Sequence, residues 1–101
     1  MEVTQKYLLT AVTESGAGSS VSVNQRRNYT IFYSSASVTT GATIVIQAQS
    51  LAGDWHQVDS KTVSADGLLI TELPNKAYIS IRANITSYTD GTHTVSFIGN
   101  D

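Results

Sequence analysis

The stretch Ala42–Ser50, which reads Ala-Thr-Ile-Val-Ile-Gln-Ala-Gln-Ser, decides the fold class. Most of its apolar residues fall on one parity and its polar residues on the other: Ile44, Ile46 and Ala48 against Thr43, Gln47 and Gln49. Successive side chains of a β-strand point to opposite faces, so this period of two predicts a half-buried strand. The turn sequence Leu51–Asp54 ends the strand and leads into the next one.

Seven further segments of the same kind lie along the chain, each bounded by turn residues. They are Tyr7–Val12, Val21–Val23, Tyr29–Tyr33, Trp55–Thr62, Leu68–Leu73, Ala77–Thr86 and Thr92–Gly99. No window carries apolar residues at the 3.6-residue spacing of a helix. Eight short strands predict an all-β fold, either a two-sheet sandwich or a small barrel, and we favour a single antiparallel β-sandwich domain over residues 1–101. Both a jelly-roll-like and an immunoglobulin-like strand order fit it, and residues 1–6 are predicted to form an extended N-terminal arm.

The turns and the core follow from the same pattern. Asp66-Gly67 and Asp90-Gly91 predict tight hairpin turns, because Gly accepts a positive φ without strain. The inward parity of the clearest strands predicts one shared core, built from Ile44, Ile46, Ile79, Ile81, Ile85 and Phe97.

The composition excludes several classes of partner. Charged residues make up 14% of the chain, and its formal net charge is -2. Only 6 residues are Lys or Arg, too few for a nucleic-acid track or for a patch that binds a membrane surface. No apolar run approaches the length of a membrane span, and residues 1–6 do not read as a signal peptide. The absence of Cys excludes disulfides and favours folding in the cytosol.

The histidines predict no metal or catalytic site. His56 and His93 are the only two, and neither has a second His or a Cys at a chelating distance along the chain. His93 shares the parity of Val95 and Phe97 and is predicted to be an inward strand residue, whereas His56 is predicted to face solvent. No Ser lies in a Gly-x-Ser-x-Gly elbow. We therefore predict no catalytic, metal or cofactor residues, no cofactor, and a protein that is not an enzyme.

The acidic residues and two asparagines have ordinary explanations. Asp54, Asp66 and Asp90 adjoin Gly and are predicted to form turns, and Asp59 lies on a strand. A calcium site between two such loops is the alternative, since calcium needs about six to eight converging oxygens. Asn28 and Asn84 match the N-glycosylation pattern, which arises by chance in a chain rich in Thr.

The aromatic residues and one arginine are the remaining candidates for binding. Trp55, the only Trp, is predicted to plug the core, with a sugar-stacking platform as the alternative. The tyrosines are predicted to pack or to contact another subunit: Tyr7, Tyr29, Tyr33, Tyr78 and Tyr88. Arg82 projects from the polar parity of its strand, as a solvated or cross-strand residue or as an interface anchor. The sequence assigns no partner-binding residues beyond these.

Two motifs carry a resemblance to a known group of proteins. These are Leu51–Trp55, a tight turn with Gly before Trp, and Tyr78–Thr86, a strand with Arg82 after alternating aliphatics. Together with the closing turn Thr89–Thr92, they make residues 42–99 resemble the small all-β virion accessory proteins of tailed bacteriophages, of the head-decoration or tail-accessory kind. The resemblance implies a non-enzymatic virion protein, made in the cytoplasm of the host bacterium.

The resemblance also implies partners. Such proteins act as symmetric oligomers, so we expect a homo-oligomer, most simply a trimer, that binds and stabilises a phage capsid or tail protein. We expect no nucleic acid and no membrane as partner. The alternative is a carbohydrate-binding or adhesive β-sandwich module.

Overall fold

The computed structural model describes residues 3–23, 27–76 and 78–100. Within these ranges the chain forms nine β-strands and no helix. The strands are β1 (Val3–Val12), β2 (Gly16–Ala17), β3 (Val21–Ser22), β4 (Asn28–Ala36), β5 (Ala42–Gln49), β6 (Trp55–Val63), β7 (Gly67–Leu73), β8 (Ser80–Tyr88) and β9 (Thr92–Asn100). The all-β prediction is confirmed.

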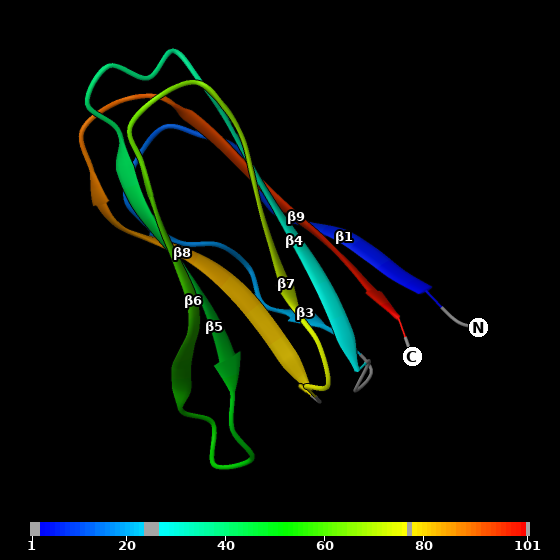
Figure 1. Cartoon of the computed structure of the whole chain (residues 1–101). Coiled ribbons are helices and arrows are strands. Elements are labelled where there is room, and N and C mark those ends of the chain that lie inside the picture. The colour runs from blue at the N-terminus through cyan, green and yellow to red at the C-terminus, as the bar shows by residue number, and fades with distance from the viewer. Residues whose placement is uncertain (1–2, 24–26, 77, 101) are drawn as a thin grey trace.

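The strands form two antiparallel sheets that pack against each other (Figure 1). The four-stranded sheet has the order β1-β9-β4-β7, and the five-stranded sheet has the order β2-β8-β5-β6, with β3 also paired to β8. Along the chain, β1, β4, β7 and β9 lie in the four-stranded sheet, and β2, β3, β5, β6 and β8 lie in the five-stranded sheet. Strands that alternate between two sheets in this order form a jelly roll, one of the two orders predicted.

One buried cluster fills the space between the sheets. Five of the six predicted core residues belong to it: Ile44, Ile46, Ile81, Ile85 and Phe97. The prediction for Ile79 is wrong, because its side chain is 41% exposed. β8 begins at Ser80, so Ile79 precedes the paired part of the strand, and its carbonyl oxygen accepts a hydrogen bond from the Val23 N–H.

The two Asp-Gly turns join strands of different sheets. Gly67 and Gly91 have φ values of +134° and +100°, as their turn positions require. Yet β6 does not pair with β7, and β8 does not pair with β9, so the prediction of hairpins is wrong at both. Each strand after the turn buries its inward side chains against the opposite sheet. The consecutive strands β5 and β6 do form a hairpin, and in its turn the Ser50 N–H donates to the Asp54 carbonyl at 2.8 Å.

The structure differs from the predicted N-terminal arm at residues 3–6. Residues 3–6 begin this strand and pair with β9 of the same chain, with Lys6 opposite Phe97, so they are part of the sandwich and not a free arm. Met1 and Glu2 lie outside the described residues. The register of β1 shifts on either side of Leu9. As a result, Leu8 and Leu9 are both buried, although neighbours on a regular strand face opposite ways.

Candidate binding surfaces

The outer face of the four-stranded sheet exposes large apolar side chains. Phe32 points outward because its neighbours Ile31 and Tyr33 are buried in the core. The register places Ile70 of β7 opposite Phe32 on one side and Ser96 on the other, and Tyr7 of β1 opposite Ser96. We call this surface the apolar face; its apolar members are Tyr7, Phe32, Leu68, Ile70 and Ile98.

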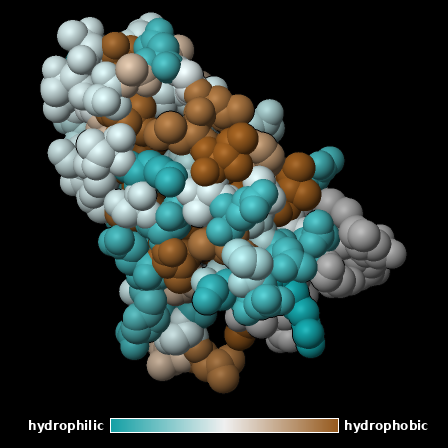
Figure 2. Space-filling model, in the orientation of Figure 1, coloured by the Kyte–Doolittle hydropathy of each residue, from teal (hydrophilic) through white to brown (hydrophobic). Residues whose placement is uncertain are grey.

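These side chains are unusually accessible for their size. Tyr7 is 65% exposed, Leu68 56% and Ile70 52%. A hollow of about 370 Å³ lies between Tyr7, Phe32 and Ile98 on this face. Figure 2 shows brown apolar surface over β7 among polar side chains. The apolar face therefore has both the composition and the relief of a surface that contacts protein.

The outer face of the five-stranded sheet is polar and carries one unusual cluster. The register aligns Arg82 of β8, Gln47 of β5 and Gln57 of β6 in one row across three strands. The Arg82 Cζ lies 4.3 Å from the centroid of the Trp55 ring, and the Arg82 Nε donates to the Gln47 Oε1 at 2.8 Å. We call these residues, Gln47, Trp55 and Arg82, the Trp55–Arg82 cluster.

The prediction that Trp55 plugs the core is wrong. Trp55 is half-buried and does not belong to the core cluster. It pairs with Gln49, whose parity is that of outward Gln47. A guanidinium over an indole ring is a favourable cation–π contact, so Trp55 is stabilised at the surface by Arg82. The structure thereby brings together two residues that the sequence treated separately.

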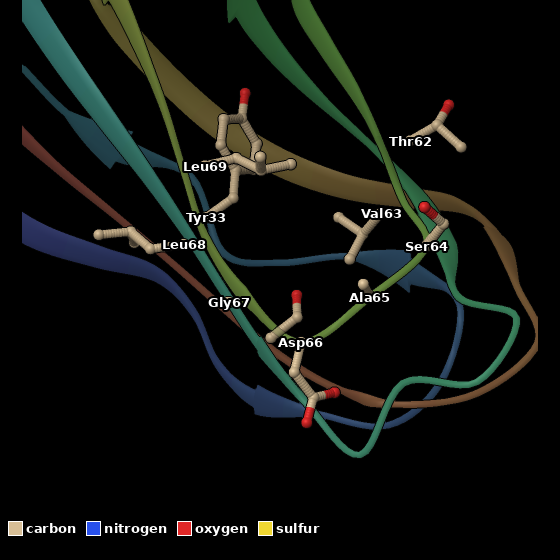
Figure 3. A pocket seen from close by; sticks show the side chains of 10 residues that line it. Tyr33, Thr62, Val63, Ser64, Ala65, Asp66, Gly67, Leu68 and Leu69 are labelled. Atoms are coloured by element: carbon tan, nitrogen blue, oxygen red, sulfur yellow. The ribbon is translucent and has the colours of Figure 1, made fainter.

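A third feature is the flank where the edge strands β6 and β7 meet. The Tyr33 hydroxyl donates to the Asp59 carboxylate and so joins β4 to β6 across the two sheets. Burial, and then the hydrogen bond and the charge of Asp59, raise the pKa of Tyr33. A hollow of about 180 Å³ lies beside this contact. Figure 3 shows Leu69 and the β6–β7 turn around it, with Leu68 pointing away.

This hollow offers little chemistry. The only buried side-chain oxygen without a hydrogen bond among the described residues is Thr71 Oγ1. Tyr33 and Asp59 satisfy one another, and the raised pKa of Tyr33 keeps its hydroxyl protonated, so it is a poor proton donor. The flank is best described as an imperfectly closed edge of the sandwich.

Two aspartates hold one end of the sandwich together. The Asp90 carboxylate accepts hydrogen bonds from the backbone N–H groups of Thr39, Thr40 and Gly41, and the Asp66 carboxylate accepts one from Val38. The N–H of Thr40, followed by that of Thr39, lowers the pKa of Asp90. These carboxylates thus accept hydrogen bonds from the backbone of the β4–β5 loop. That role explains why the two aspartates lie in turns, and it does not require a calcium ion.

The histidines lie as the parity predicts. His93 is fully buried, and its Nδ1 lies 2.8 Å from the Ser35 Oγ and its Nε2 3.0 Å from the Asp90 carbonyl. Since a carbonyl oxygen only accepts, Nε2 carries the proton and Nδ1 accepts from Ser35. His56 is exposed. Among residues 3–23, 27–76 and 78–100, no three acidic or His side chains gather as metal ligands, and no helix could cross a membrane.

The remaining candidates are mostly structural. Tyr29 and Tyr33 are buried, and Tyr78 stacks on Tyr29 with ring centroids 5.3 Å apart. The Tyr88 hydroxyl donates to the Gly91 carbonyl at 2.8 Å. Of the five tyrosines, Tyr7 alone is largely exposed. Two further candidates are half-buried: the Asn28 side chain accepts from the Asn75 N–H, and Asn84 lies on β8.

Sequence reasoning missed the apolar face, although a signal was present. Leu68, Leu69 and Ile70 are three consecutive apolar residues. On a strand, such a run must place apolar side chains on both faces. The run therefore marks a strand whose outer face is apolar.

The comparisons with known proteins concern the fold. No family model matches the chain, and no curated protein matches it significantly. The crystal structure of the SPBc2 prophage-derived protein YomS superposes with a TM-score of 0.75 at 16% identity, over 97% of this chain and 92% of that one. PirA gives 0.51 at 15% identity, over 98% and 93%. A structure described as "CBM4 structure and function" gives 0.51 at 12% identity, over 97% and 67%.

Proposed function

We propose that this chain is a non-enzymatic structural protein of a phage particle, which associates with copies of itself and binds the capsid or tail surface. The observation that carries the proposal is the apolar face. Exposed apolar area of this kind is unfavourable in water, and burying it is worth roughly 25 cal/mol per Å². A partner that covers Tyr7, Phe32 and Ile70 would recover that free energy.

The form of association follows from the chain's size and sheet edges. A domain of 101 residues has a modest core, and burial between subunits would add stability. Closed symmetric oligomers match the local symmetry of a particle, and we favour a trimer. The exposed edge strands β1 and β7 flank the apolar face, so association there would also cover sheet edges.

Two similarities support a phage origin. Residues 42–99 resemble virion accessory proteins of tailed phages in their Gly-before-Trp turn and in the strand that carries Arg82. The fold is also that of a prophage-derived protein, at a TM-score of 0.75. Under this proposal the chain is made in the host bacterial cytoplasm and ends in the virion.

The test compares one new charge on each outer face. Ile70→Lys places a charge on the apolar face, and Ser60→Lys places the same charge on the exposed outer side of β6. We expect light scattering at micromolar concentration to give an oligomer for the wild type and for Ser60→Lys, and a mass near 10.8 kDa for Ile70→Lys. Thermal unfolding of both variants checks that the fold is kept.

Two results would overturn this proposal. A wild-type protein that is monomeric at every concentration contradicts self-association. Purified particles of the parent phage in which mass spectrometry finds no stoichiometric copy of the chain contradict the particle role.

The second candidate function is a carbohydrate-binding or adhesive module. The observation that favours it is the place of Trp55, at the surface beside a row of amide side chains, where sugars are commonly bound. Glycan binding without any association with particles would favour this candidate.

A further inference from the structure

The outer face of the five-stranded sheet is built differently from a protein-contact surface. Its central row consists of Arg82, Gln47 and Gln57, and Trp55 lies diagonally beside it. The amides offer both donors and acceptors. Val45, two residues before Gln47 on β5, is only 5% exposed. This face therefore presents hydrogen-bonding groups where the apolar face presents carbon.

Arg82 is held in place before any ligand arrives. The Arg82 Nε donates a hydrogen bond to the Gln47 Oε1, and the guanidinium group lies over the Trp55 ring. These two contacts leave the paired terminal N–H groups of the fork without a partner among the described residues. A guanidinium fixed in this way loses little side-chain entropy on binding.

The charge of Arg82 is also uncompensated. No carboxylate of the described residues forms an ion pair with it; its contacts are the Gln47 amide and the Trp55 ring. The guanidinium fork matches a carboxylate in geometry, with two parallel N–H···O bonds. A ligand that brings a carboxylate would complete the cluster.

We propose that the Trp55–Arg82 cluster binds a carbohydrate that carries carboxylate groups, with Arg82 on the carboxylate and the amides of Gln47 and Gln57 on neighbouring hydroxyls. A sugar is favoured over an acidic protein segment because none of the exposed large apolar side chains among the described residues lies on β5, β6 or β8. The inference deepens the carbohydrate-binding candidate and does not depend on the apolar face.

The experiment titrates isotope-labelled protein with a galacturonic acid oligomer and follows the backbone and indole N–H signals by NMR. Two matched probes are used: the methyl ester of the same oligomer, which is neutral, and a poly-glutamate peptide, which has the carboxylates but no sugar. We expect the acid oligomer to shift the Trp55 indole signal and its strand neighbours, and the ester to bind roughly tenfold or more weakly.

Variants assign the effect to Arg82. Arg82→Gln should lose roughly tenfold to a hundredfold in affinity, and Arg82→Lys, which keeps the charge but not the fork, should lose less. Lys76→Gln removes the same charge from an exposed loop residue and should bind like the wild type. Trp55→Phe, which keeps an aromatic ring under Arg82, provides a second variant if Arg82→Gln unfolds.

The outcomes separate this inference from the proposed particle role. Equal binding by Arg82→Gln and the wild type, or equal binding of the acid and its ester, overturns the inference. Binding of poly-glutamate without the oligomer overturns it in favour of a protein partner. Arg82→Gln should keep the wild-type solution mass, so failure of the sugar site leaves self-association to its own test.

Discussion

The two outer faces of the sandwich cover the same core but differ in chemistry. On the four-stranded sheet the outward residues include Tyr7, Phe32 and Ile70, and on the five-stranded sheet they include Gln47 and Arg82. Phe32 lies between the buried Ile31 and Tyr33, and Arg82 lies between the buried Ile81 and Ala83, so both sheets show the same alternation. Alternation thus indicates which side chains point away from the core, but it does not indicate which partner they contact.

The difference indicates two separate demands on the chain. A monomer in water gains nothing from exposing Leu68 and Ile70, and the proposed contact with protein would account for the apolar face. Arg82 and Trp55 gain from each other in the monomer, but this contact leaves part of the guanidinium unused. Under the proposed function and the further inference, the two faces bind two kinds of partner, and the following predictions test this contrast.

The largest expected effect is on the free energy of unfolding, when an isoleucine in the core and an isoleucine on an outer face are each changed to Ala. Ile81 is 1% exposed and Ile70 is 52% exposed. Ile81→Ala should lower the free energy of unfolding by about 2–5 kcal/mol, whereas Ile70→Ala should change it by less than about 0.5 kcal/mol in a monomer. Chemical denaturation at a concentration where the chain is monomeric measures both. Equal losses would show that the outward assignment of β7 is wrong.

A smaller effect concerns the contact between Trp55 and Arg82. A double-mutant cycle with Trp55→Ala, Arg82→Ala and the double variant isolates their coupling energy. We expect about 0.5–1 kcal/mol, the value of an exposed cation–π contact. A coupling near zero would mean that Arg82 is not held over the ring in solution, which would remove the preorganisation on which the sugar site depends.

The faces should also respond differently to salt. Association through the apolar face buries carbon and should persist as ionic strength rises, because screening acts on charges. Binding of an acidic oligomer at Arg82 should weaken over the same range. Light scattering and an NMR titration, each at low and at high sodium chloride, make the comparison. Dissociation of the oligomer by salt would show that charges, and not Phe32 and its neighbours, hold the subunits.

The sequence predicted the strands and most of the core for a clear physical reason. In β4 the parity of Tyr29, Ile31 and Tyr33 is the parity of burial, because a strand between a core and solvent must alternate. The same reasoning placed His93 inward correctly. Parity is a local property, and these predictions needed only local information.

The errors needed information from distant residues. The sequence predicts an inward Trp55 because large aromatics usually are buried, but Arg82, 27 positions later along the chain, gives it a surface partner. The sequences Asp66-Gly67 and Asp90-Gly91 predict hairpins, but the two carboxylates accept hydrogen bonds from the β4–β5 loop instead. Neither partner can be inferred from the turn itself. The candidate surfaces were therefore less predictable than the strands that carry them.

The smallest expected effect is on the pH dependence of stability, through the β4–β5 loop that connects the two sheets. The β4–β5 loop, which leads from one sheet to the other, donates three backbone N–H groups to Asp90. These bonds lower the pKa of Asp90 below its ordinary value of 3.8. A carboxyl group whose pKa is lower in the folded state stabilises the fold above its unfolded pKa and loses this contribution as the pH falls through the folded value. The unfolding temperature of the wild type should therefore decrease below about pH 4.

Variants assign this acid-dependent loss to Asp90. Asp90→Asn should be less stable than the wild type at neutral pH, because a neutral acceptor bonds N–H groups more weakly than a carboxylate. It should also lose less stability on acidification. Asp54→Asn serves as the control, since its exposed carboxylate accepts no hydrogen bond among the described residues, and it should keep the wild-type pH profile. If the unfolding temperatures of Asp90→Asn and the wild type depend on pH in the same way, the charge of Asp90 does not stabilise the β4–β5 loop. The hydrogen bonds to residue 90 would then stabilise the loop without a contribution from its charge.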